Sequence, residues 1–165
     1  MKGHKDVVQI LLQRGAQPNK VDKCGFTPLY MAARKGYKEA VQLLLQRGAE
    51  PNMGNQYGST PLHKATHCGH KDVAKQLIDR GADPNGTNIL GETSLHHAVR
   101  NNNKDLVKLL VDNGADQNIA DERGMTPLSH AREKGYLDIV NILTDQEPQR
   151  QQQHQQQQRH ICRMQ

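Results

Sequence analysis

Three histidines and one cysteine lie within eight residues of the stretch GSTPLHKATHCGH, which begins at Gly58. His63 and His67 are four residues apart, so on a helix their imidazoles share one face. Paired histidines at this spacing are a common way to present two ligands to a zinc ion. The residue types therefore suggest a metal site or a catalytic pair, and the surrounding sequence has to decide between these and a purely structural role.

Two short motifs recur along the chain at a fixed spacing of 33 residues. The first reads GFTPLY, GSTPLH, GETSLH and GMTPLS, beginning at Gly25, Gly58, Gly91 and Gly124. The second reads LLQRGAQPN, LLQRGAEPN, LIDRGADPN and LVDNGADQN, ending at Asn19, Asn52, Asn85 and Asn118. A 33-residue period with T-P-L-H-x-A is the signature of one repeat architecture. From Met1 to about Glu147 the chain resembles the ankyrin-repeat family.

The resemblance implies an all-α solenoid of stacked helix-turn-helix units with β-hairpins projecting from them. We expect one ankyrin-repeat domain over 1–147 and a disordered, glutamine-rich tail over 148–165. The domain divides into a half repeat at 1–20 and repeats at 21–53, 54–86, 87–119 and 120–147.

The chemistry of a single repeat agrees with this reading. Thr27 stands where a helix needs an N-cap, and Pro28 follows at the first helical position, where its missing N–H has no cost. Gly36 breaks the first helix. Gly48 ends the second helix, in the left-handed conformation that suits glycine.

The repeat also explains the histidine spacing. His63 occupies the position of Tyr30, His96 and Ser129, so its place is inherited from the repeat. The family resemblance implies that this imidazole hydrogen-bonds to neighbouring backbone. His67 and Cys68 are particular to this copy, and two ligands make neither a closed nor an open zinc site. We favour the structural reading and keep zinc binding or catalysis as the minor alternative.

Nothing else in the sequence suggests an enzyme. The motifs GxxxxGK[ST], HExxH, GxSxG and CxxC are absent from the sequence. We expect no catalytic residue, no metal, no cofactor and no small-molecule substrate. Three widely spaced cysteines and the lack of a signal-like or membrane-spanning segment lead us to expect an intracellular protein, cytoplasmic or nuclear or both, with no membrane insertion.

The two ends of the array differ. The first unit supplies only a second helix. Its apolar residues Val7, Ile10 and Leu11 would normally be covered by a first helix, which the sequence does not contain. We therefore interpret the chain as a fragment, an isoform or a truncated gene product of a longer array. At the other end, Arg132 and Thr144 replace residues that are apolar or small in the other units, as a C-terminal cap requires.

The unit 54–86 departs most from the others. Lys64 replaces a Met or His, Thr66 a small apolar residue, and Gln76 an Ile or Leu. These changes are either ordinary drift between repeats or a softer, more polar patch that binds something.

A solenoid offers one long shallow groove, which suits a protein surface better than a small substrate. We therefore expect a non-catalytic scaffold that binds a partner protein through its groove and hairpin tips. The candidate contacts at the tips are Lys23, Cys24, Phe26, Gln56, Tyr57, Ser59, Ile89, Leu90, Glu92, Glu122, Arg123 and Met125. The first helices add Arg34, Lys35, His67, Cys68, Arg100 and Asn101, followed by Glu133 and Lys134.

The apolar candidates inside a polar rim are typical of a binding hot spot, although they could instead pack against neighbouring hairpins. A partner segment with acidic and apolar residues suits this surface, and we expect the chain itself to be a monomer. The resemblance further implies that Asn52 and Asn85 can be hydroxylated by an asparaginyl hydroxylase; alternatively these side chains hold the hairpin turns.

Two other functions stay open. The array could be the targeting part of a larger enzyme or channel whose other domains are absent. The net charge of +5 could also support weak nucleic-acid binding through the tail, which carries Arg150, Arg159 and Arg163. Residues 1–147 are close to neutral, with 19 basic and 17 acidic side chains, so we expect nucleic-acid binding to be the weaker alternative.

Overall fold

The computed structural model describes residues 3–145. Within this part of the chain the backbone forms nine helices and no β-strand, so the predicted all-α fold is confirmed. The helices are α1 (Gly3–Gln13), α2 (Pro28–Lys35), α3 (Lys38–Gln46), α4 (Pro61–His67), α5 (Lys71–Asp79), α6 (Ser94–Arg100), α7 (Lys104–Asp112), α8 (Pro127–Glu133) and α9 (Leu137–Thr144). The expected disorder of 148–165 concerns residues outside the described range.

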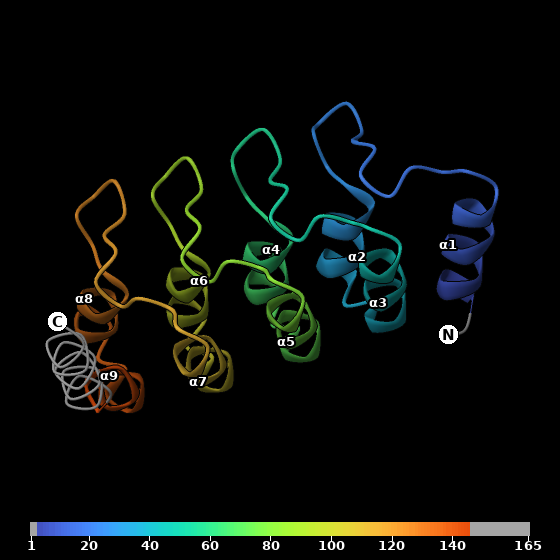
Figure 1. Ribbon diagram of the computed structural model, residues 1–165. Helices are drawn as coiled ribbons and strands as arrows, with labels where there is room; N and C mark the ends of the chain where they lie inside the picture. The colour runs from blue at the N-terminus through green and yellow to red at the C-terminus, as the bar shows by residue number, and fades with distance from the viewer. Residues whose placement is uncertain (1–2, 146–165) are drawn as a thin grey trace, which may run out of the picture.

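The helices stack in two rows. Helices α2, α4, α6 and α8 pack one after another in an inner row, and α1, α3, α5, α7 and α9 form an outer row behind it. Figure 1 shows the pairs side by side from one end of the chain to the other, with long loops projecting from the same side of the array. Because each pair contacts only its neighbours, the molecule is the solenoid that the repeat predicts.

Capping residues determine where these short helices begin and end. The hydroxyl of Thr27 accepts a hydrogen bond from the Tyr30 N–H at 3.0 Å, and Pro28 begins α2, as the sequence predicts. Gly36 ends α2 at a φ of +70°, in the left-handed region. Asn102 holds the equivalent place after α6 with a φ of +51° and is the one non-glycine residue in 3–145 at positive φ.

The core is built almost entirely from Leu, Val, Ile and Ala. Leu29, Leu62 and Leu95, one from each of three successive inner helices, are fully buried. Alanines at 32, 65 and 98 lie on the same helices and are also buried. Small side chains let neighbouring helices approach closely, so the chain needs little aromatic bulk.

The four projecting loops, residues 14–27, 47–60, 80–93 and 113–126, contain no β-strand, so the predicted β-hairpins are not confirmed. In each loop an Asp or Asn side chain accepts backbone N–H bonds from the residues two and four positions later. These residues are Asp22, Asn55, Asn88 and Asp121. The loops are thus held by side-chain turns.

The first helix is open on one side. The side chains of Val7, Ile10 and Leu11 are 56%, 49% and 53% exposed, whereas Leu43 and Leu44, at the positions of Ile10 and Leu11, are 7% and 2% exposed. The sequence predicts this difference, because no inner helix pairs with α1 in the described residues. At the other end, Arg132 is exposed and Thr144 half-buried, in agreement with a capping role.

The predicted polar patch in the unit 54–86 lies partly in the core. Thr66 is fully buried, and its hydroxyl has no hydrogen-bond partner within residues 3–145. The same is true of the side-chain oxygen of Gln76 in that range. Buried polar atoms without partners cost stability, so local sequence and packing disagree at these two positions.

Candidate functional site

The histidine that opened the sequence question has a structural role. His63 is buried, and its Nδ1 accepts the Thr60 N–H at 3.2 Å. Its Nε2 therefore carries the proton and donates to the backbone oxygen of Glu92 at 3.0 Å, in the next loop. His96 repeats this bond to the backbone oxygen of Met125 at 3.0 Å. The predicted imidazole–backbone bond is confirmed, and it ties consecutive units together.

His70 is also used by the fold. Its Nε2 donates to the backbone oxygen of Arg34 at 3.2 Å, at the end of the preceding inner helix. The residues in 3–145 contain no group of three or more His, Cys, Asp or Glu side chains that could hold a metal ion. The close spacing of these histidines follows from the repeat, since each bonds to a different neighbouring unit.

A further histidine, which the sequence analysis did not single out, lies beside His63 and His67. The ring of His97 meets the rings of His63 and His67 edge to face, with centroids 5.9 Å and 5.5 Å apart. Burial, together with the smaller effect of the neighbouring His63, lowers the pKa of His97 to about 4 against the opposing effect of Glu92. Burial also lowers the pKa values of His63 and His67. At neutral pH this cluster is uncharged.

Glu92 was expected to contact a partner, and the structure corrects this. Its side chain is only about 10% exposed. One oxygen accepts from Arg100, and the other accepts from the Asn88 amide at 3.0 Å. Burial alone would raise the pKa of Glu92, but the bonds from Arg100 and Asn88 outweigh it and lower the pKa to about 2. Glu92 therefore fixes loop 80–93 to α6 and presents no free carboxylate.

Three of the predicted apolar residues form a patch at the loop tips. Tyr57, Ile89 and Leu90 are 53%, 56% and 49% exposed. Tyr57 belongs to loop 47–60 and the other two to loop 80–93, and the Ile89 N–H donates to the Tyr57 backbone oxygen at 3.0 Å. We call these three residues the tip patch. Adjacent loops thus place large apolar side chains together in solvent.

Other apolar candidates are less available. Phe26 is half-buried and stacks on Tyr30 with ring centroids 4.8 Å apart. Met125 and Ser59 are also half-buried. For Phe26 the alternative of packing within the array therefore describes the structure better than that of a free anchor.

The polar candidates are mostly exposed. At the loop tips these are Lys23, Cys24, Gln56, Glu122 and Arg123. At the ends of the inner helices they are Arg34, Lys35, His67, Cys68, Arg100 and Asn101. The amide of Asn101 also donates to the backbone oxygen of His67 at 2.8 Å, across neighbouring units.

The loops approach each other closely, and their glycines permit it. Gly58 and Gly91 have positive φ values of 68° and 71°. A Cβ on Gly91 would lie 3.1 Å from the Asp121 Cα, and one on Gly58 would lie 3.3 Å from the Asn88 Cα. Gly58 and Gly91 therefore serve both the turn and the stacking of the next loop, which brings the loops that carry the tip patch close together.

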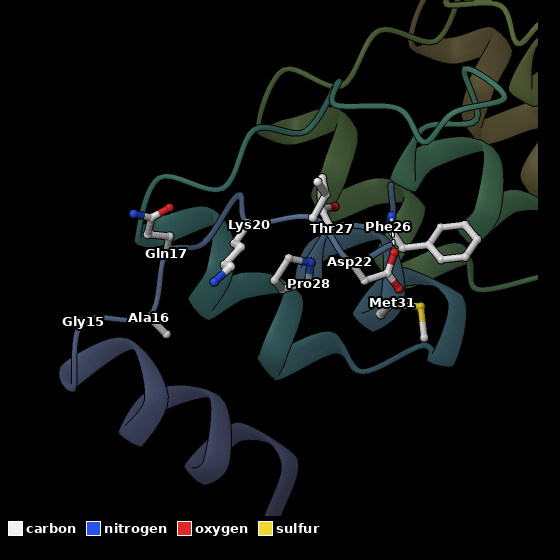
Figure 2. Close-up of a pocket in the computed structure, with 10 residues that line it drawn as sticks. Gly15, Ala16, Gln17, Lys20, Asp22, Phe26, Thr27, Pro28 and Met31 are labelled. Atoms are coloured by element: carbon white, nitrogen blue, oxygen red, sulfur yellow. Dashed lines mark hydrogen bonds between the residues drawn. The ribbon is translucent and has the colours of Figure 1, made fainter. Parts of the chain in front are cut away.

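A hollow of about 640 Å³ lies at the N-terminal end of the array. Figure 2 shows it between Gly15 and Ala16, which follow α1, and the beginning of α2, with Phe26, Met31 and Lys20 around it. It is open to solvent. Its lining holds no cluster of groups suited to catalysis.

The sequence analysis missed two kinds of residue that shape this face. One is the set of loop residues Asp22, Asn55, Asn88 and Asp121, whose regular 33-residue spacing was visible in the sequence. The other is His97, which follows the T-P-L-H position of its unit, as Met31 and Lys64 do in theirs. The position of His97 in the repeat was the feature of the sequence that could have identified it.

The asparagines that end the second motif connect successive units. The Asn52 amide donates to the Gly81 oxygen at 2.9 Å, and its Oδ1 accepts the Asp83 N–H at 2.8 Å. Asn85 makes the same pair of bonds to the Gly114 oxygen and the Asp116 N–H. Hydroxylation of Asn52 and Asn85 stays a prediction, while their turn-holding role is present in the structure.

These features define a helical-repeat solenoid with a loop-edged inner face. A family model described as ankyrin repeats, in three copies, matches residues 1–88 and residues 83–154. The chain belongs to the ankyrin-repeat family. No match to the sequence is found among curated proteins. Ankyrin repeats are in general protein–protein interaction modules and are typically non-catalytic. None of the helices in 3–145 has the length and apolarity needed to cross a membrane.

Proposed function

We propose that this chain is a non-catalytic module that binds a partner protein across its loop tips and inner-helix face. The tip patch carries this proposal. Large apolar side chains that stay about half exposed on neighbouring, hydrogen-bonded loops are unfavourable in water and suited to burial against a partner. The same surface would serve if the chain were the targeting part of a larger enzyme or channel.

The exposed polar candidates at the helix ends and loop tips form the rim of this proposed surface. Arg34, Lys35, His67, Cys68 and Asn101 lie at the C-terminal ends of the inner helices. Phe26 and Glu92 are no longer included as direct contacts, because one stacks within the array and the other is engaged by Arg100.

Affinity capture from a cell lysate treated with nuclease tests the proposal. The baits are the wild-type chain, the variant Tyr57→Ala/Ile89→Ala/Leu90→Ala, and Leu137→Ala as a control at another exposed apolar side chain, 73% exposed on α9. We expect a protein that the wild type and the control retain at high salt and the triple variant loses. A partner retained equally by all three baits would place binding elsewhere.

A further inference from the structure

Charged side chains are unevenly distributed along the inner face of the array, which consists of the inner helices and the projecting loops. Loops 14–27 and 47–60 with helices α2 and α4 carry seven Lys and Arg against two Asp and Glu. The next two loops, 80–93 and 113–126, with α6 and α8 carry four basic against six acidic residues. The N-terminal half of this face is therefore strongly basic, and the C-terminal half, with a net charge of −2, is close to neutral.

Several other charged side chains form ion pairs within the fold. On the outer row, Lys38 pairs with Asp72, Lys71 with Asp105, and Lys104 with Asp138.

On the inner face, Arg100 is bound by the buried Glu92.

By contrast, Lys23, Arg34, Lys35 and Lys64 form no ion pair with any residue in 3–145. Lys64 lies near His67, since its charge helps to lower the pKa of that imidazole after the effect of burial. The basic half of the face is thus available to an external anion.

The tip patch lies where the basic half meets the neutral half. Tyr57 is on the last loop of the basic half, and Ile89 and Leu90 are on the first loop of the neutral half. Loop 80–93 is held in place by the buried Glu92 carboxylate through Asn88, whose own side chain closes the turn around Leu90. The apolar anchors are therefore presented by a fixed loop at the border of the basic half.

We propose that this face binds an extended acidic segment of a partner protein. Apolar side chains of the segment pack on the tip patch, and its carboxylates face Arg34, Lys35 and Lys64. This inference rests on the proposed protein-binding function and adds the chemistry and the placement of the partner. Opposite charges steer such a segment to the basic half, while the apolar contacts slow its release.

The observations favour a protein segment over a nucleic acid. Single-stranded nucleic acids bind on platforms of several aromatic side chains along a basic channel. In the tip patch only Tyr57 is aromatic, and the following loop carries Asp121 and Glu122, which would repel the phosphates of a strand that continued along the face.

Selection from a random twelve-residue peptide display library tests the inference, with the full wild-type chain as bait. Affinities of the selected peptides, made as fluorescent probes, are then measured by anisotropy. The charge variant is Arg34→Glu/Lys35→Glu/Lys64→Glu. Its control, Lys5→Glu/Lys75→Glu/Lys108→Glu, makes the same change in net charge on the outer row. The apolar pair is Tyr57→Ala/Ile89→Ala/Leu90→Ala with the control Leu137→Ala.

We expect selected peptides to be rich in Asp and Glu together with large apolar residues. The charge variant and the tip-patch variant should each weaken binding at least about tenfold, and both controls should bind as the wild type does. Circular dichroism of every variant verifies that the helices are intact.

Other outcomes separate the two proposals. Peptides without acidic enrichment, or insensitive to the charge variant, overturn the acidic-segment inference; if they still need the tip patch, the proposed function stands. Binders that respond to neither variant, or no binders at all, overturn the acidic-segment inference, and the lysate capture then decides the proposed function separately. An oligothymidylate probe that binds this face and displaces the peptides would assign the face to nucleic acid and also overturn the inference.

Discussion

The core contains polar side chains as well as apolar ones, and Thr66 is one of them. Thr66 is 0% exposed, and its Oγ1 has no hydrogen-bond partner in the described part of the chain. The equivalent residue of the following unit is Val99, which is also 0% exposed. Both side chains are β-branched and similar in volume, so the two positions differ mainly in whether a hydroxyl is buried.

We expect Thr66→Val to raise the free energy of unfolding by about 1–2 kcal/mol, because it removes a buried polar group without a partner. The reciprocal change Val99→Thr should lower it by a similar amount. Urea denaturation followed by circular dichroism measures both. A Thr66→Val variant less stable than the wild type would show that the hydroxyl finds a partner, such as an ordered water molecule.

At the scale of the helices and loops, asparagine side chains hold neighbouring units in register. Asn19, Asn52 and Asn85 each bridge to the following unit through one donated and one accepted bond. Asn118 instead donates within its own loop, to Asp116 at 3.2 Å. The same residue type at the same place in the repeat thus either bridges two units or bonds within its own loop.

Asn52→Ala should therefore destabilise the protein by roughly 1–3 kcal/mol, since it removes both bridging bonds and leaves the Asp83 N–H and the Gly81 oxygen without this partner. Asn118→Ala is the matched control and should change stability by no more than about 0.5 kcal/mol. Thermal unfolding of the two variants measures the difference. Equal losses would mean that the bridges between units contribute little.

Across the whole molecule, buried imidazoles couple the fold to pH. Burial lowers the pKa values of His63, His67, His96 and His97 from 6.5, in the last case to about 4. In the unfolded chain these groups take up protons below about pH 6.5, while the folded chain resists doing so. A lowered pKa of a base therefore means that stability falls as the pH drops through this window.

We expect the free energy of unfolding to decrease steadily from pH 6.5 to pH 4, the interval between the ordinary and the lowered pKa of His97. His97→Met, which introduces the residue found at the equivalent position 31, should reduce this decrease by an amount on the order of 2 kcal/mol. Below pH 4.5, protonation of Glu92 adds a further loss, because its pKa is lowered to about 2.

Urea titrations at several pH values test this, with His4→Gln as the control on the exposed face of α1. A decrease of the same size in His97→Met and the wild type would contradict the assignment. The prediction concerns the array as a whole, because the three rings of the cluster come from two neighbouring units and unfold with them.

Much of the fold could be predicted from the 33-residue period alone. The Thr-Pro caps, the helix-ending glycines and the open apolar side of α1 are local consequences of residue type, and the structure contains all of them. No β-strand forms within 3–145, so the predicted β-hairpins are not confirmed. Each loop is closed by a backbone bond, such as that from the Asp22 N–H to the Phe26 oxygen, together with the side-chain bonds of Asp22 or its counterpart. The repeat pattern predicts the place of the loops and does not show how far their backbone pairing extends.

The candidate surface was predicted only in part. The sequence determined which residues stand at loop tips and helix ends, since those positions follow from the period. The tertiary structure alone decided that Glu92 turns inward to Arg100, that Phe26 stacks on Tyr30, and that Tyr57 and Ile89 meet in solvent. The last of these contacts joins residues about one repeat apart, and the other two depend on how loop and helix pack. In a solenoid, exposure is set by the neighbouring unit, so it appears only when the units are stacked.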